Sequence, residues 1–213
     1  MAERRPIATR DTSWAKSLAA RLARAGLSAN AISILSIVFA AGAAAALLVS
    51  DGPAWRAWLV LAALGIQLRL LCNMFDGMVA VEHDRATPEG ALYNEVPDRI
   101  ADTVILVAAG HALAAGAWGP MLGWASALMA MFTAYVRVLG GALGTPQYFI
   151  GPQSKSQRMA VMTAAALLAA VMPSPAQAGR VLTVALVVVL VGSTITVIRR
   201  VLRVARELRS RAA

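Results

Sequence analysis

The carboxylates of this chain are concentrated in one short stretch. Of the 11 acidic residues, seven lie between residues 76 and 102: Asp76, Glu82, Asp84, Glu89, Glu95, Asp98 and Asp102. Asn73 and Asp76 are three residues apart, so on a helix they share a face. Asn94, Asp98 and Asp102 are spaced by four and form a second stripe. Carboxylate and amide oxygens at this density suit Mg²⁺, Mn²⁺ or Ca²⁺, so the spacing predicts a cation site between two adjoining helices.

The composition places these helices in a membrane. Of the 213 residues, 59% are hydrophobic and only 15% are charged, which is too little polar surface to cover a soluble domain. We expect an all-α integral membrane protein, one membrane domain over residues 1–213, because a span needs about 20 mostly apolar residues. The six expected transmembrane helices cover roughly 31–50, 54–80, 91–116, 120–143, 157–173 and 179–198, with a basic cytoplasmic tail over 199–213.

A short amphipathic helix is expected before the first span. In residues 12–25, Trp14, Leu18 and Leu22 recur at helical spacing, and basic residues occupy other positions around the helix. This pattern is typical of a helix that lies in the membrane interface, and the alternative is a disordered basic leader. Ser28 is well placed to cap the first span.

The basic residues predict the orientation. Of 20 Lys and Arg residues, only Arg56 and Arg180 lie near the loops opposite the termini. This bias predicts that both termini, and the acidic stretch with them, are on the cytoplasmic side of the inner membrane. The net charge of +9 then reflects orientation and contact with anionic lipid headgroups. Nucleic acid is not an expected partner, because the basic residues flank spans and are not interleaved with aromatic residues.

Residues 73–98 resemble the signature of the CDP-alcohol phosphotransferase family, also called CDP-alcohol phosphatidyltransferases. They read N-M-F-D-G-M-V-A-V, eight further residues, then G-A-L-Y-N-E-V-P-D, against the family pattern Asp-x2-Asp-Gly-x2-Ala-Arg-x8-Gly-x3-Asp-x3-Asp. Five anchors match at identical spacing: Asp76, Gly77, Ala80, Gly90 and Asp98. In the family this motif spans the second and third helices of a six-helix fold with a leading interfacial helix, so the resemblance extends to the architecture.

The resemblance implies transfer of a phospho-alcohol group, such as phosphatidyl from CDP-diacylglycerol, to an acceptor hydroxyl with release of CMP, in phospholipid biosynthesis. In the family, four aspartates hold two divalent cations, Mg²⁺ or Mn²⁺, and the last aspartate is the general base. Carried over, Asp76 and Asp98 would bind metal and Asp98 would also be the base. Gly77, Ala80 and Gly90 would leave room for the nucleotide. The family also implies a homodimer.

Three signature positions depart from the family. Asn73 and Asn94 replace aspartates, and Val81 replaces arginine. The asparagines could still ligate a metal through their carbonyl oxygens, but without charge, so we expect weaker divalent binding with one firm metal. In these asparagines and in its GPQSKSQR stretch, the chain resembles a divergent bacterial branch of the family.

Nearby side chains could compensate for these departures. Glu95 or Asp102 could supply some of the missing negative charge. Arg85 or Arg69, each about one helical turn from the motif, could replace the arginine lost at Val81.

A second set of charges could bind an anionic acceptor. Arg137 lies in the fourth expected span, and Lys155 and Arg158 follow it in the GPQSKSQR stretch. Together they could bind a sugar or polyol phosphate. The alternatives are that Lys155 and Arg158 are ordinary cytoplasmic loop charges, and that Arg137 is a structural partner of an acidic residue of the motif.

Two other functions compete with the enzyme. A catalytically weakened or inactive relative could bind CDP-lipid or metal as a partner or regulator, which the asparagines and Val81 favour. A small transporter with an acidic site is disfavoured, because the acidic residues lie at helix ends and not at the middle of the bilayer.

Overall fold

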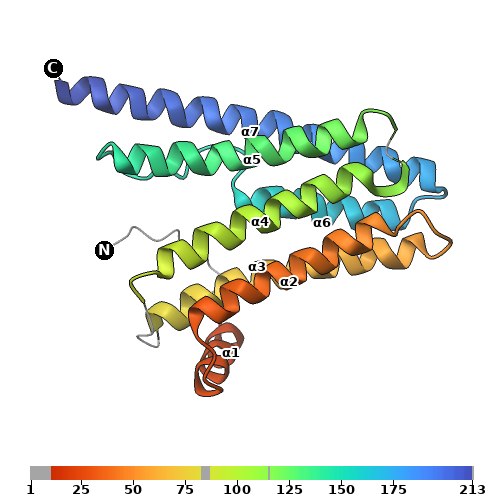
Figure 1. Cartoon of the computed structure of the whole chain (residues 1–213), viewed down its shortest axis with the longest axis horizontal. Helices are drawn as coiled ribbons and strands as arrows, with labels where there is room; N and C mark the ends of the chain where they lie inside the picture. The colour runs from red at the N-terminus through yellow and green to blue at the C-terminus, as the bar shows by residue number, and fades with distance from the viewer. Residues whose placement is uncertain (1–10, 83–86, 115, 213) are drawn as a thin grey trace.

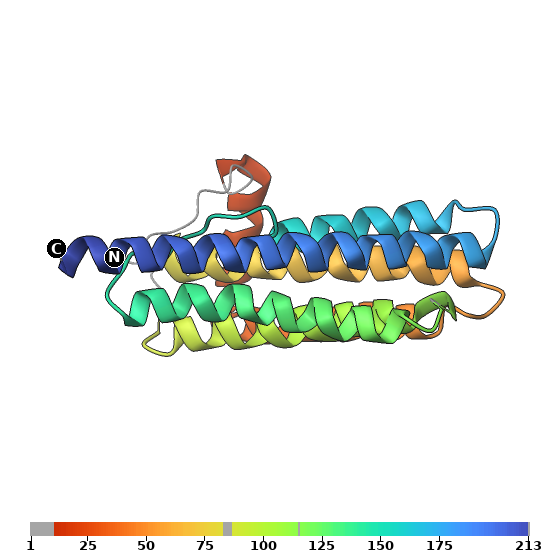
Figure 2. The same cartoon turned by 90° about the horizontal axis from the view of Figure 1, so that it is seen from above.

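The computed structural model describes residues 11–82, 87–114 and 116–212, and within those ranges the chain is helical with no strand. Its elements are α1 (Ser13–Arg24), α2 (Ala29–Leu48), α3 (Trp55–Glu82), α4 (Gly90–His111), the short 3₁₀ turn η2 (Ala112–Ala114), α5 (Gly119–Ala142), α6 (Lys155–Ala170) and α7 (Pro175–Ala212). Helices α2 to α7 run side by side in one elongated bundle, and α1 runs across its long axis (Figures 1 and 2). The all-helical architecture expected from the sequence is therefore confirmed.

Four helices in the described part of the chain are long and apolar enough to cross a membrane: Ala29–Leu48, Trp55–Val81, Gly119–Ala142 and Pro175–Arg211. The other two expected spans correspond to α4, whose first half carries the charges of the motif, and to α6, which has only 16 residues. Both are packed within the same bundle (Figure 2). Composition marks this protein as a membrane protein, and six spans stay a prediction.

Several helix ends differ from the expected ranges for identifiable reasons. Helix α6 begins at Lys155, because Ser154 and Gln157 form a capping box in which the Gln157 side chain accepts from the Ser154 N–H at 2.8 Å. Helix α7 is continuous for 38 residues, so the sixth expected span and the basic tail are one helix. Helix α2 starts after Ser28, whose hydroxyl accepts from the Ala31 N–H at 3.1 Å.

Helix α1 packs through a different face from the one its large residues suggest. Its buried residues are Ala15, Ala19 and Ala23, four residues apart, which let α1 lie close to α3. Trp14 stays half-exposed and meets the ring of Phe75 edge-on, with 6.2 Å between centroids. The alanine face thus binds the bundle, and the large apolar residues remain available to the surroundings.

Helices α4 and α5 cross backbone to backbone at two glycines. A Cβ atom on Gly110 would lie 2.4 Å from the carbonyl oxygen of Gly119, and one on Gly123 would lie 2.9 Å from that of Leu106. Small residues at such crossings are typical of membrane helices. This contact holds α4, and with it the acidic stretch, in place against α5.

Candidate functional site

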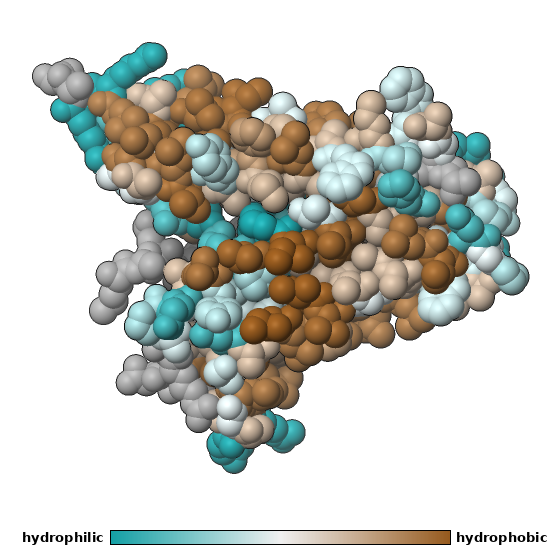
Figure 3. Space-filling view, viewed as in Figure 1, coloured by the Kyte–Doolittle hydropathy of each residue, from teal (hydrophilic) through white to brown (hydrophobic). Residues whose placement is uncertain are grey.

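The charged residues meet at one end of the bundle. At this end α3 and α5 finish, α4 and α6 begin, and the last turns of α7 project past the other helices (Figure 1). Figure 3 shows the molecule hollowed here, between an arm formed by α5 and α7 and the ends of α3 and α4, with hydrophilic residues at the inner end of the hollow. Polar side chains from five helices converge behind this opening.

Asp76 of α3 is buried, with 3% of its surface exposed. Its Oδ2 atom accepts a hydrogen bond from the Ser33 hydroxyl at 2.6 Å and from the Asn94 amide at 3.4 Å. Its Oδ1 atom is also buried and has no hydrogen-bond partner in the described part of the chain. A buried carboxylate oxygen without a donor is energetically costly, so this atom has the vacant coordination that a bound cation would satisfy.

Asp98 of α4 is equally buried, but both of its oxygens are taken. Oδ1 accepts from the Asn73 amide and from the Arg69 guanidinium at 3.2 Å. Oδ2 is bound by the ammonium of Lys155. The expected metal ligand and base is therefore in contact with two cationic side chains and one amide, and a third cation, Arg99, lies 3.7 Å from Oδ2.

Asp102 lies one turn deeper and joins two buried arginines. Its Oδ1 is 2.7 Å from Nη2 of Arg69, and its Oδ2 is 2.7 Å from Nη2 of Arg158. Arg158 also donates through Nη1 to the Thr133 hydroxyl at 3.1 Å and to the Gln153 carbonyl at 2.9 Å. These contacts connect α3, α4, α5 and α6 in one buried polar network.

Two arginines that the sequence analysis considered for ligand binding lie inside this network. Arg158, expected to bind the acceptor, has only 1% of its surface exposed and is held in the core by Asp102. Arg69, considered as a replacement for the arginine missing at Val81, is fully buried between Asp98 and Asp102. Neither guanidinium is open to a ligand. Arg85 lies outside the described residues.

Arg137 is paired with an acidic residue of the motif. Its Nη2 atom bonds the carboxylate of Glu95, and its Nη1 atom donates to the Gln147 side chain at 2.6 Å. The guanidinium carbon lies 5.2 Å from the centroid of the Phe149 ring. The sequence offered two roles for Arg137, and this ion pair agrees with the second, a structural partner of an acidic residue in the motif. The pair lies at the rim of the site, where Glu95 is half-exposed.

The expected nucleotide-binding residues lie on the same helix ends. Gly77 and Ala80 are half-buried on α3 after Asp76, and Gly90, also half-buried, is the first residue of α4. Val81 has 60% of its surface exposed. The position that carries arginine in the family is therefore open in this chain.

Sequence reasoning missed Ser33 as a member of the site. It is a buried serine in the apolar helix α2 and supplies the only hydrogen bond under 3 Å that a side chain makes to Asp76 among the described residues. Its signal was a polar residue one turn after the helix cap, in a span whose other side chains are mostly apolar.

The cationic side chains of the site outnumber its carboxylates. Among the described residues, the carboxylates of Glu95, Asp98 and Asp102 form ion pairs with five cationic side chains: Arg69, Arg99, Arg137, Lys155 and Arg158. Asp76 takes part in none of these pairs. No group of three or more His, Cys, Asp or Glu side chains in the described ranges is arranged to hold a metal ion. Within the described ranges, the carboxylate oxygen of the site that is buried without a hydrogen-bond partner is Oδ1 of Asp76.

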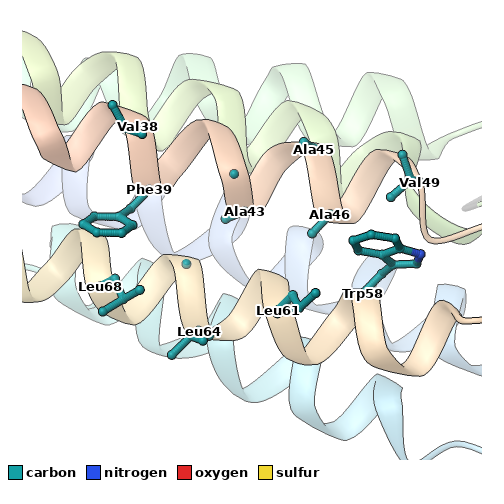
Figure 4. Close-up of a pocket in the computed structure, with 12 residues that line it drawn as sticks. Val38, Phe39, Ala43, Ala45, Ala46, Val49, Trp58, Leu61, Leu64 and Leu68 are labelled. Carbon is teal, nitrogen blue, oxygen red and sulfur yellow. The ribbon is translucent and has the colours of Figure 1, made fainter.

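An apolar groove of about 430 Å³ lies between α2 and α3, away from these charges. Figure 4 shows it bordered by Phe39, Leu64 and Leu68 and closed toward the far end by Trp58. Its lining offers no group for catalysis, so the polar end of the bundle is the candidate active site.

Comparison with solved structures identifies the fold. No family model and no curated protein sequence matches the chain. The crystal structure of Mycobacterium tuberculosis phosphatidylinositol phosphate synthase with CDP-DAG bound aligns with a TM-score of 0.71 at 21% identity, over 89% of this chain and 92% of that chain. The same enzyme with manganese and citrate gives 0.70 at 20% identity, over 89% and 88%. The chain therefore shares its fold with this phosphatidylinositol phosphate synthase over most of its length.

Proposed function

We propose that this protein transfers a phosphatidyl or related phospho-alcohol group from a CDP-activated lipid to an acceptor hydroxyl and releases CMP, as a step in phospholipid biosynthesis. The observation that carries the proposal is the buried Asp76, with one vacant carboxylate oxygen, beside Asn94 and Asp98. Asp76 belongs to the last two turns of α3, the helix end beside the hollow, in a fold shared with an enzyme crystallised with CDP-DAG. The charge bias of the loops supports a cytoplasmic location for this end.

The residues around Asp76 fit a divalent cation. The vacant Oδ1 atom supplies a charged ligand, and the amide oxygens of Asn73 and Asn94 are hard neutral ligands of the kind that Mg²⁺ and Mn²⁺ accept. A structural neighbour was crystallised with manganese. A cation bound here would neutralise the donor diphosphate and the charge that develops on the leaving CMP.

We propose Asp98 as the residue that takes the proton from the acceptor hydroxyl. Asn73 and Arg69 fix its Oδ1 atom, and its Oδ2 atom faces Lys155, whose side chain is 28% exposed at the mouth of the site. Lys155 and Arg137 are the cations placed to receive an anionic acceptor. Gly77, Ala80 and Gly90 would leave space for the nucleotide.

A second candidate function is a non-catalytic protein that binds CDP-lipid. The observation that favours it is the complete pairing of Asp98, which leaves no free oxygen on the proposed base. The acceptor would have to displace Lys155 before Asp98 could take up a proton.

CMP release separates the two functions. The purified protein would be given CDP-diacylglycerol in mixed micelles, Mg²⁺ or Mn²⁺, and a panel of polyols and polyol phosphates. We expect CMP only with metal and one class of acceptor, lost in Asp98→Asn and retained in Asp11→Asn, a control outside the site. Absence of CMP with every acceptor, in protein that still binds the CDP-lipid, would contradict the transferase and favour the binding protein.

A further inference from the structure

The two buried carboxylates of the site have opposite surroundings. Asp76 and Asp98 are each 3% exposed. Among the described residues, the side chains that donate to Asp76 are neutral, and none donates to its Oδ1 atom. Asp98 is contacted by an ammonium and a guanidinium, and a second guanidinium, that of Arg99, lies 3.7 Å from its Oδ2 atom. Among the described residues, no cationic side chain is in ion-pair contact with Asp76, and three are in contact with Asp98.

The two asparagines of the site also differ in how firmly they hold these two carboxylates. Asn94 holds Asp76 by a long bond of 3.4 Å, so its amide can turn its oxygen toward an ion there with little loss. Asn73 makes a short bond to Asp98 from the side opposite Lys155. An ion that approached Asp98 would have to break that bond and meet the ammonium. A divalent cation therefore finds an open carboxylate oxygen at Asp76, whereas at Asp98 it would have to displace the ammonium in contact with that carboxylate.

Lys155 is a cation at the N-terminus of a helix, a position that disfavours positive charge. It is the first residue of α6, where the helix dipole disfavours a positive charge, and it is one of only two lysines in the chain, with Lys16. The cap between Ser154 and Gln157 fixes its backbone, and Arg158, three residues later, anchors the same face of the helix to Asp102. Its contact with Asp98 compensates for the unfavourable position.

We infer that Lys155 is a built-in cation that occupies the place of a divalent ion at Asp98, and that the site accordingly holds one divalent cation, at Asp76. The inference deepens the proposed function, since it concerns the same site, but it is stated for metal binding in the absence of any substrate. Its failure is therefore distinct from a failure of the transferase.

Counting bound Mn²⁺ tests the inference. The full-length protein in detergent would be titrated with Mn²⁺ alone, and free Mn²⁺ would be followed by its electron paramagnetic resonance signal. We expect one ion per chain in the unchanged protein, none in Asp76→Asn, and one in Asp98→Asn. Lys155→Gln is expected to bind two ions and Lys155→Arg one. Lys16→Gln, which removes the exposed lysine of α1, is the matched control and is expected to bind one.

Three results would overturn the inference: two ions or none in the unchanged protein, loss of the ion in Asp98→Asn, or a single ion in Lys155→Gln. A thermal unfolding curve for each variant identifies any that does not fold. If Asp76→Asn fails to fold, the Asp98 and Lys155 variants still decide the question, because they report on opposite sides of the same contact.

Discussion

Arg158 of α6 donates to Asp102 of α4 at 2.7 Å, with side-chain exposures of only 1% and 3%. Arg69 of α3 binds the other oxygen of the same carboxylate and reaches Asp98 as well. One buried carboxylate thus ties three helices together and fixes, through Arg69, the orientation of the proposed base. Because Arg69, Asp102 and Arg158 are almost fully buried, we expect the network to position Asp98 and not to contact a ligand.

Asp102→Asn should strongly destabilise the fold. The substitution leaves two buried arginines without their carboxylate, and breaking a buried ion pair on one side costs about 3–5 kcal/mol. The free energy of unfolding in mixed micelles, followed by circular dichroism during a titration with denaturing detergent, measures the effect. Asp11→Asn, at an exposed position, is the control. A loss below about 1 kcal/mol would show that these buried ion pairs do not hold the helices together.

Gly110→Ala should destabilise the crossing of α4 and α5. The new methyl group would lie 2.4 Å from a backbone oxygen, and overpacking of this kind costs about 1–3 kcal/mol. Gly42→Ala is the matched control, because no heavy atom outside its own turn lies within 4 Å of the added carbon. There, improved helix propensity should stabilise the protein by up to about 1 kcal/mol. Equal effects of the two substitutions on the unfolding free energy would argue against the close crossing.

Val81→Arg should strengthen binding of the CDP-lipid. The position is 60% exposed near the end of α3, so a long cationic side chain fits without repacking. One charge-assisted contact to phosphate at an exposed site is worth about 1 kcal/mol, or roughly fivefold in Kd. Competition binding with a fluorescent CDP-lipid measures the change, and Val81→Gln controls for side-chain length. The prediction fails if the arginine and glutamine variants bind alike.

Gly151→Ala should weaken binding of the acceptor in addition to straining the backbone. Gly151 has φ of +117°, and an added Cβ would lie 2.6 Å from the Thr196 side chain on α7. The same loop is held there by Gln153, whose N–H donates to Thr196 at 3.0 Å, and it leads directly into Lys155. Displacing it should raise the KM for the acceptor by roughly tenfold, or about 1.4 kcal/mol.

Gly26→Ala is the control for backbone strain. Gly26 also has a positive φ, +83°, but nothing lies within 4 Å of an added Cβ and it is outside the site. Both variants should lose about 1–2 kcal/mol of stability from the strained backbone. Only the Gly151 variant should change the KM for the acceptor. A similar change of KM in both variants would show that the position of the Gly151 loop does not affect acceptor binding.

Much of the architecture could be predicted because it depends on local properties. The length of an apolar run and the residues that cap a helix can be read directly from neighbouring positions in the sequence. The helical repeat then predicts which polar residues share a face, as it does for Asn73 and Asp76 and for Asn94 and Asp98. The start of α2 after Ser28 follows from this logic. The packing face of α1 did not, because the small residues Ala15 and Ala19 matter only once a partner helix approaches closely.

The sequence by itself determined that the protein is helical, built for a membrane, and has its carboxylates at one end of two neighbouring helices. Only the tertiary structure decided which cation meets which carboxylate. Lys155 and Arg158 are one helical turn apart, yet one reaches Asp98 at the mouth and the other is buried against Asp102. That difference depends on how deeply α6 sits between α3 and α7, which results from side-chain packing across the whole bundle and from no local pattern.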